Sequence, residues 1–494
     1  MFAQHMSGQQ HKKNQNQPSE QMFENTSRTE TNCSRNASKG AFPYPSSCDW
    51  CPRACGANRL AGERGVCGAS NEMRVARAAL HFWEEPPISG EAGSGTVFFT
   101  HCPLKCVYCQ NYEIALGDMR ALEETIALGD ASKLRGTNAL GRADELGGVS
   151  ALNEIGKSLT PEQLANTFLN LQDQGALNIN LVTPTHHWPV IKRAVNVAQK
   201  STPTQPTPRK NTTTQTPAHT SQKSSQAQTP REETLHLPIV WNTSGYETPE
   251  AIRALRSTVD VYLTDFKYAD PQLAKDLSNA PDYPRVALDA LREMLRATDT
   301  PKYDEYAGQV RLVRGVVVRH MLLPGQVNNS LRVLDALADI WREWDAKNNH
   351  PKSHREHECV NNCGLEDRGI NQTSNKHTQS EQPEPSRVKQ TNVRAIPKTP
   401  PPFLLSIMNQ YTPVIARRSP APRPQTHTPH VHPLALTPQS RALQKYPELA
   451  RPATSAEYEE VLDYADSLGF EDYFWQEGQP AKESFIPAFD LTGV

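Results

Sequence analysis

The chain has 494 residues and lacks any apolar run near the about 20 residues that a membrane-spanning helix needs. Its first residues show neither the apolar core of a secretion signal nor an arginine-rich amphipathic pattern. It also lacks an excess of one charge, because 52 basic residues stand against 54 acidic ones. That balance gives no reason to expect nucleic acid as a partner. We therefore expect a cytoplasmic protein that binds neither membrane nor nucleic acid.

Apolar residues are also scarce in four stretches of the chain. Residues 1–40 are rich in Gln, Asn and Ser, residues 201–234 in Thr, Gln, Pro and Ser, residues 350–400 are polar and charged, and residues 417–432 are rich in Pro and His. Such compositions bury too little apolar surface to fold alone, so they predict a disordered tail and three disordered insertions. The remaining roughly 300 residues suffice for one sizeable core. We expect a cysteine-rich module at 41–90 and a core domain at 91–494 that carries the insertions.

The ten cysteines are few for this length, but most stand in close groups. In a long chain without a signal peptide, such grouping indicates metal ligands in a reducing compartment rather than disulfides. Cys102, Cys106 and Cys109 have the spacing C-x3-C-x2-C and follow a predicted strand at 96–100. Three thiolates can hold three irons of a cubane cluster and leave the fourth iron open. A zinc knuckle or unrelated thiols are the alternatives, although a structural zinc ion normally takes four protein ligands.

A second group lies upstream, where Cys48, Cys51, Cys55 and Cys67 have the spacing C-x2-C-x3-C-x11-C. Four thiols form a closed site for either structural zinc or a second iron–sulfur cluster, and the spacing does not choose between them. Buried free cysteines are the structural alternative.

Strand-like and helix-like segments alternate between the polar stretches. Short apolar runs rich in β-branched residues predict strands at 96–100, 178–183, 238–243, 261–266, 315–323 and 404–409. Helical spacing of apolar residues predicts helices at 161–174, 249–256, 329–344 and 456–468. This alternation predicts an α/β fold with a parallel sheet.

These motifs carry a family resemblance. The three cysteines, with Tyr108 before the last, look like the signature of radical S-adenosylmethionine (SAM) enzymes. More narrowly, the chain resembles the branch described as similar to pyruvate formate-lyase activating enzyme. The matching segments are residues 84–90, 93–96, 109–112, 178–186, 241–246, 264–268, 319–325, 408–413 and 483–487. The resemblance implies a partial (β/α)6 barrel, open on one side compared with the eight-stranded form. It also implies a [4Fe–4S] cluster, SAM as cofactor, and a reductase such as flavodoxin or ferredoxin as electron donor.

The resemblance also assigns roles to polar residues at predicted strand ends. Asp265 and Lys267 have the spacing of two residues on one face of a strand, so both can point into one site. By resemblance they contact the amino and carboxylate groups of the methionine portion; a salt-bridged pair on the rim is the alternative. By resemblance, Arg319 matches the position of an arginine near the cofactor's carboxylate or ribose. Its planar guanidinium suits a carboxylate. Tyr108 is expected near the adenine.

One segment departs from the common pattern of radical SAM enzymes. Many of them carry Gly-Gly-Glu-Pro after the second strand, where this chain has Thr183, Pro184, Thr185 and His186. We expect backbone carbonyls and the Thr185 hydroxyl to accept the cofactor's ammonium instead.

The implied activity is that of an oxidoreductase of the radical SAM type. It would cleave SAM reductively to a 5′-deoxyadenosyl radical, which abstracts hydrogen from a glycine of a protein substrate or from a small molecule. An electron-transfer or metal-binding protein is the first alternative, and it would need the cluster but not Asp265, Lys267 and Arg319. A scaffold role resting on the polar insertions is the second.

Overall fold

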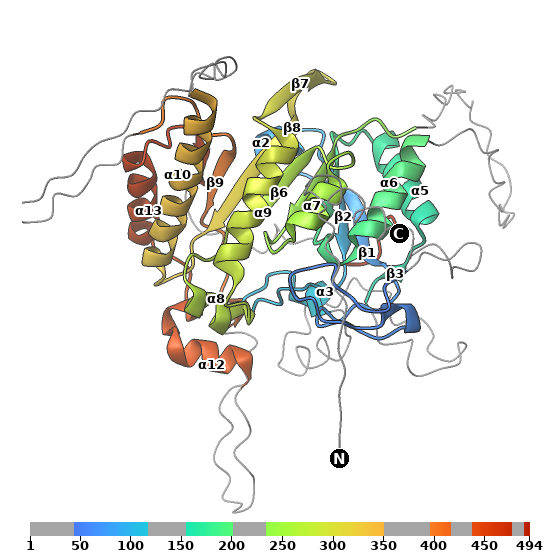
Figure 1. Cartoon of the computed structure of the whole chain (residues 1–494), viewed down its shortest axis with the longest axis horizontal. Coiled ribbons are helices and arrows are strands. Elements are labelled where there is room, and N and C mark those ends of the chain that lie inside the picture. Colours follow the sequence, from blue (N-terminus) through green and yellow to red (C-terminus); the bar gives the residue numbers. More distant parts are fainter. Residues whose placement is uncertain (1–43, 117–154, 201–233, 350–395, 416–436, 477–488) are drawn as a thin grey trace, which may run out of the picture.

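The structure is a computed structural model that describes residues 44–116, 155–200, 234–349, 396–415, 437–476 and 489–494 (Figure 1). The tail expected at 1–40, and nearly all of the insertions expected at 201–234, 350–400 and 417–432, lie outside the described residues. Residues 483–487 of the family resemblance lie outside them as well.

One mostly parallel sheet runs through the described part of the chain. Its strand order is β10-β9-β8-β6-β5-β4-β2-β1-β3. The parallel series consists of β2 (Ser94–Phe99), β4 (Ile179–Val182), β5 (Ile239–Thr243), β6 (Val261–Asp265), β8 (Gln309–Met321) and β9 (Leu404–Met408). These are the six predicted strands, and they lie side by side in chain order. The predicted α/β class and the parallel sheet are confirmed.

The remaining strands extend this series at its edges. β1 (Arg74–His81) pairs antiparallel with β2, and β3 (Lys157–Ser158) pairs antiparallel with β1. At the other edge β10 (Tyr473–Phe474) runs parallel to β9. β7 (Lys302–Tyr306) forms a hairpin with β8 through Ala307 and Gly308, whose φ angles of 52° and 76° are those of a type I′ turn. This hairpin makes β8 start earlier than the predicted strand at 315–323.

Helices pack around the sheet (Figure 1). The longer ones are α5 (Pro161–Asp173), α6 (Trp188–Lys200), α7 (Pro249–Leu255), α8 (Pro271–Ser278), α9 (Tyr283–Thr298), α10 (Val327–Asn349), α12 (Pro438–Lys445) and α13 (Ser455–Ser467). The shorter ones are α2 (Pro86–Ser89), α3 (Tyr112–Leu116), and the 3-10 turns η1 (Arg59–Ala61), η4 (Thr185–His187) and η5 (Pro447–Ala450). The four predicted helices are confirmed as α5, α7, α10 and α13. Within the described ranges, no helix has both the length and the apolar character that a membrane crossing requires.

Several helices start with the same local chemistry. Thr160, Thr248 and Asp270 accept hydrogen bonds from backbone N–H groups of the first turns of α5, α7 and α8. A proline follows each of these capping residues, where its fixed φ suits a helix and its missing N–H costs nothing. These signals fix where each helix begins after a strand, and so set the length of the loops at the strand ends.

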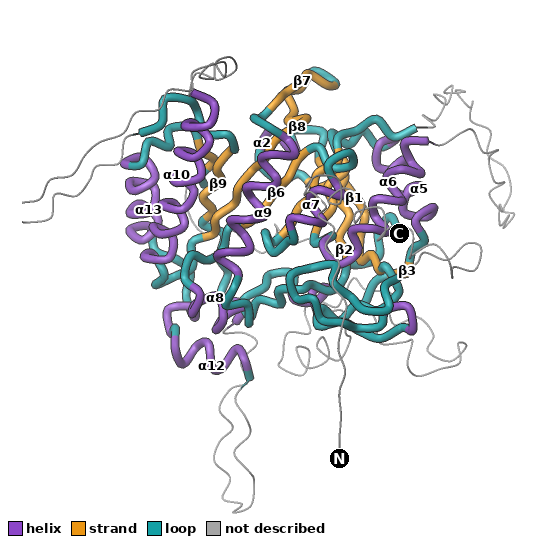
Figure 2. Tube along the Cα trace, viewed as in Figure 1, coloured by secondary structure: helices purple, strands orange, loops and turns teal. Residues whose placement is uncertain are grey.

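The first described residues, 44–73, form a module that consists almost wholly of loops (Figure 2). The module lies at the end of the sheet where α3 and α8 are found (Figure 1). Arg53 ties it to the core, donating to the carbonyls of Pro103 at 2.9 Å and Ser278 at 2.9 Å. The module therefore contacts the loop that carries Cys102, Cys106 and Cys109.

Candidate active site

A cavity of about 360 Å³ opens at the carboxyl ends of the parallel strands. Its lining residues follow or end successive strands: Thr183 after β4, Thr243 and Ser244 at the end of β5, Asp265 and Lys267 at the end of β6, Arg319 and Met321 on β8, and Ser406 and Met408 on β9. In α/β folds with parallel strands, ligands bind at this edge of the sheet. The volume is in the range of small-molecule sites.

The loop after β2 brings three thiols to this cavity. Cys102, Cys106 and Cys109 all belong to its lining. The loop folds tightly because His101 and Lys105 adopt left-handed backbone conformations, with φ of 69° and 51°, which are uncommon outside glycine. The sequence-predicted trio is therefore together in space, on one wall of one cavity.

Hydrogen bonds hold this loop and its sulfurs. The Ser278 hydroxyl donates to Cys106 Sγ at 3.0 Å, and the Leu104 amide donates to Cys102 Sγ at 3.4 Å. The Val107 amide donates to the carbonyl of Leu277 at 2.9 Å, which fixes the loop to the end of α8. Donors aimed at sulfur stabilise thiolates, the form in which cysteine binds metal.

Without a metal, Cys102 and Cys109 favour the protonated form. Burial raises the pKa of Cys102 to about 11 and that of Cys109 to about 12, and the neighbouring Cys106 adds to both shifts. Metal binding would release those protons. Within the described residues, no three Cys, His, Asp or Glu side chains converge on one point as the ligands of a single ion would. A cubane cluster places each thiolate on a different iron, so its ligands stand further apart than those of one ion.

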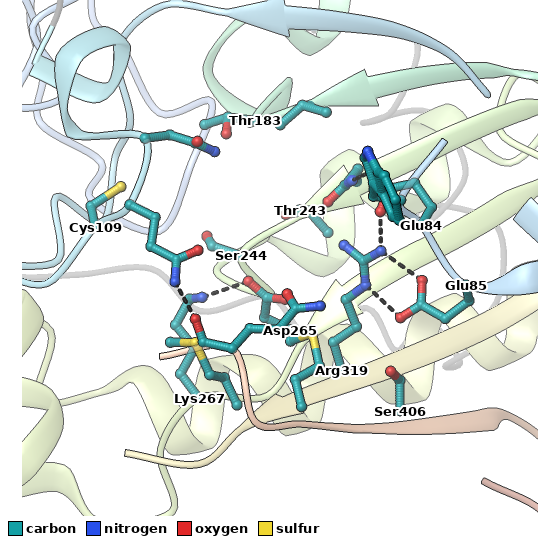
Figure 3. Close-up of a pocket in the computed structure, with 18 of the residues that line it drawn as sticks. Glu84, Glu85, Cys109, Thr183, Thr243, Ser244, Asp265, Lys267, Arg319 and Ser406 are labelled. Carbon is teal, nitrogen blue, oxygen red and sulfur yellow. Dashed lines mark hydrogen bonds and ion pairs between the residues drawn. The ribbon is translucent and has the colours of Figure 1, made fainter. Parts of the chain in front are cut away.

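Asp265 and Lys267 face the same cavity as an ion pair. Lys267 Nζ lies 2.5 Å from Asp265 Oδ2, and both side chains are mostly buried (Figure 3). Burial alone would lower the pKa of Lys267, but Asp265 and Cys106 raise it, and the net shift is upward. The lysine therefore stays charged. The sequence-predicted pair is thus placed in the cavity with the three cysteines.

Arg319 also lines the cavity, but its guanidinium binds two glutamates (Figure 3). Its Nε donates to Glu85 Oε1 at 2.8 Å and its Nη2 to Glu85 Oε2 at 2.6 Å; Nη2 also contacts Glu84 Oε2. Burial would lower the pKa of Arg319, but the two glutamates hold it well above its ordinary value. The arginine is therefore committed to protein carboxylates, which differs from the expected contact with a cofactor carboxylate.

The two glutamates are functional candidates that the sequence reasoning missed. They precede α2, and their side chains are 8% and 6% exposed. Asn180 Nδ2 donates to Glu84 Oε1 at 2.9 Å, which further satisfies that carboxylate. Both belong to the segment 84–90 singled out by the family resemblance, which was the available signal. With Asp265, they give the lining three carboxylates against the charges of Lys267 and Arg319.

Tyr108 lies in the cavity lining at one end of a chain of hydroxyl groups. Its hydroxyl is 2.7 Å from that of Tyr268, which is 2.7 Å from Ser278 Oγ. Ser278 in turn donates to Cys106 Sγ at 3.0 Å. The tyrosine is thereby fixed beside the cysteine loop.

Thr185 lies outside the cavity lining. It is 1% exposed, and its hydroxyl donates to Glu247 Oε1 at 2.6 Å. Thr183 lines the cavity instead, with a left-handed φ of 57°. The structure therefore does not place the Thr185 hydroxyl where it was expected to accept from an ammonium group, because the side chain lies outside the cavity lining.

Cys48, Cys51, Cys55 and Cys67 all lie in the N-terminal module and not in the lining of this cavity. The structure thus keeps the two cysteine groups apart, as their separation in sequence predicts.

Comparison with known proteins adds little to this geometry. No family model matches the chain. The chain is 25% identical over 239 residues to the uncharacterized protein MJ0674 of Methanocaldococcus jannaschii, a match that covers 48% of this chain and 50% of that protein. The chain therefore spans about half the length of the curated relative that it matches.

Proposed function

We propose that this chain is a radical SAM enzyme that holds a [4Fe–4S] cluster on Cys102, Cys106 and Cys109. The observation that carries the proposal is the meeting of these three thiols with the Asp265–Lys267 pair in one cavity at the strand ends. An electron-transfer protein would need the thiols but would have no use for a charged pair facing them.

The cavity suits the cofactor in charge and in functional groups. SAM carries a sulfonium cation, an ammonium and a carboxylate. Lys267 can bind the carboxylate and Asp265 the ammonium, since each offers the complementary charge. Three lining carboxylates against two cations leave one net negative charge, before any thiolate is counted. A cationic ligand is therefore favoured over an anionic one.

When bound, the reduced cluster supplies the electron that cleaves the sulfonium–carbon bond of SAM to give methionine and a 5′-deoxyadenosyl radical for hydrogen abstraction. The protein's own part is to hold and orient. Ser278 and the Leu104 amide stabilise the thiolates, and Tyr108 packs beside the loop. Glu84 and Glu85 keep Arg319 charged in the cavity wall.

The proposal includes the finer architecture and setting. The six parallel strands, neighbours in chain order and joined by helices, support a partial (β/α)6 barrel preceded by the cysteine-rich module. A reductase such as flavodoxin or ferredoxin would deliver the electron, in a reducing cytoplasm that keeps the thiols available. The hydrogen donor is either a glycine of a protein substrate, as in activating enzymes, or a small molecule.

Electron paramagnetic resonance (EPR) tests the proposal directly. The protein is reconstituted anaerobically with iron and sulfide and reduced, and its spectrum is recorded with and without SAM. We expect SAM to change the signal of the wild type, because the open iron gains ligands. The Cys102→Ala variant, which keeps the N-terminal cysteines, shows whether any signal comes from elsewhere in the chain.

Two lysine variants sharpen the result. Lys267→Met should retain the cluster signal but need much more SAM to change it. Lys445→Met is the matched control, because Lys445 pairs with Asp276 outside the cavity lining and is 50% exposed. A reduced wild-type cluster whose signal ignores SAM would favour an electron-transfer protein and overturn the proposal.

A further inference from the structure

The N-terminal module contains a second group of thiols with the features of a metal site. A methyl group built at Gly65 would stand 3.2 Å from Cys55 Sγ and 3.4 Å from Cys67 Sγ, so both sulfurs lie against the same glycine. Cys48 forms a side-chain hydrogen bond with Cys55, and Cys51 lies within electrostatic reach of Cys48 and Cys67. Cys48 and Cys51 are buried, and neither forms a disulfide. Four free thiols this close together, in a module with almost no helix or strand, are more than packing requires.

Backbone amides in this module are oriented toward the sulfurs. The Ala69 amide donates to Cys67 Sγ at 3.4 Å. The amides of Trp50 and Arg53 donate to the sulfurs of Cys48 and Cys51. In all three cases the donor lies two residues after the cysteine. Amides that hydrogen-bond to sulfur stabilise thiolates in metal sites.

A buried cation next to the thiols gives independent support. Arg59 is fully buried, and its guanidinium lies 5.0 Å from the ring centre of Tyr44 and 4.7 Å from that of Trp50. It donates to the carbonyls of Ser70 and His186, at 2.7 Å each. Among the described residues, no carboxylate forms an ion pair with it.

A buried guanidinium without a counter-charge is costly. Arg59 forms a side-chain hydrogen bond with Cys48 and lies within electrostatic reach of Cys67. Four thiolates around an oxidised [4Fe–4S] cluster, whose own charge is about +2, carry a net charge of about −2. A thiolate centre would therefore supply the negative charge that Arg59 lacks.

We propose that Cys48, Cys51, Cys55 and Cys67 bind a metal of their own as a closed four-thiolate centre, with Arg59 as its buried counter-cation. The centre is an iron–sulfur cluster with all of its ligands supplied by the chain, because within the described residues no three Cys, His, Asp or Glu side chains converge as the ligands of a single ion would. Its role is structural, because it leaves no coordination position open.

The centre stabilises the loop of the cavity through Arg53, which lies between Cys51 and Cys55. Arg53 donates to the Pro103 carbonyl within that loop and to the Ser278 carbonyl, and the Ser278 hydroxyl donates to Cys106 Sγ. Gly68 reinforces this contact, because a methyl group there would stand 2.8 Å from the His101 ring. Metal binding in the module therefore orders the neighbouring cysteine loop as well.

The test uses the full chain with Cys102, Cys106 and Cys109 all changed to Ala, so that the cavity can hold no cluster. Zinc, iron and acid-labile sulfide are then measured per chain after purification. We expect iron and sulfide in similar amounts, and zinc without sulfide would show a single ion and contradict the cluster. Adding Cys51→Ser should abolish the bound metal, whereas adding Cys33→Ser should not.

A second measurement covers the case in which the Cys51→Ser variant fails to fold. The folded triple variant is titrated with a mercurial thiol reagent, and we expect metal release to follow the blocking of the four module thiols. A triple variant that purifies without metal, or that keeps its metal after Cys51→Ser, would overturn the proposal. Neither result bears on the cluster in the cavity, because that site is absent from this background.

Discussion

The pairing of Arg319 with Glu84 and Glu85 makes a quantitative prediction about stability. Replacing Arg319 by Met removes the cation and leaves two carboxylates whose side chains are 8% and 6% exposed. Breaking a buried ion pair by removing one partner costs about 3–5 kcal/mol of unfolding free energy. In a core domain of this size, each kcal/mol corresponds to about 2–4 °C, so the Tm should fall by about 10 °C.

The assay is thermal unfolding of the metal-free protein, which separates this effect from any cofactor. Arg332→Met is the matched control, because Arg332 pairs with Asp270 at 3.0 Å but is 54% exposed. An exposed pair contributes about 1 kcal/mol or less, so this variant should lose no more than about 4 °C. Changing Glu84 and Glu85 to Gln in the Arg319→Met background should recover most of the loss, because the uncompensated charges are then gone.

The effect should also depend on pH in a defined direction. Burial would raise the pKa of Glu85, but Arg319 lowers it below the ordinary value of 4.5. The contribution of the Arg319–Glu85 pair to stability is therefore complete at pH values above 4.5. The contribution is lost as pH falls through the lowered pKa of the folded state. In Arg319→Met, acid neutralises the carboxylates, and the Tm difference from wild type should shrink. A loss no larger than that of Arg332→Met, or one that persists unchanged into acid, would refute the reasoning.

Three further predictions concern the cavity and the module. Lys267→Met should weaken SAM binding to the reconstituted protein by at least about tenfold, because one charge-assisted contact is lost. Calorimetric titration measures the Kd with Lys445→Met as the control, and an unchanged Kd in Lys267→Met would show that the lysine has no such role. Ser278→Ala should make the reduction potential of the cluster more negative by about 40 mV, because the hydrogen bond to Cys106 Sγ stabilises the reduced cluster, which carries more negative charge. A redox titration with an unshifted midpoint potential would contradict this. Arg53→Ala should speed the loss of the iron–sulfur absorbance in the presence of a chelator. Arg53→Lys should restore only part of the protection, since a lysine cannot reach the carbonyls of Pro103 and Ser278 together. Equal rates in the wild type and both variants would show that the module does not stabilise the loop.

The sequence predicted the six parallel strands because each is a short apolar run buried on both faces, which is the simplest pattern to read. It did not predict β1, whose alanines and arginines have low strand propensity and which depends on pairing with β2. Helix α9 was also missed, although buried residues such as Val286, Ala290, Leu291 and Met294 recur at helical spacing along it. Its signal was present in the sequence and was overlooked.

The candidate site shows a different limit. Spacing was enough to bring Cys102, Cys106 and Cys109 together, and Asp265 with Lys267, because these residues are neighbours in the chain. The contact of Arg319 with Glu84 and Glu85 joins residues more than 230 positions apart, which no local pattern encodes. Thr185 was expected in the site, but the structure places Thr183 there. Neither the left-handed backbone of Thr183 nor the contact of Thr185 with the buried Glu247 can be read from the sequence.

Formation of 5′-deoxyadenosine tests the central claim most directly. The protein is reconstituted anaerobically with iron and sulfide, reduced with dithionite and given SAM, and the product is quantified for the wild type and for Cys106→Ala. We predict 5′-deoxyadenosine from the wild type and none from the variant. A wild type that carries its cluster and yet forms no 5′-deoxyadenosine, or a Cys106→Ala variant that forms as much as the wild type, would contradict the account.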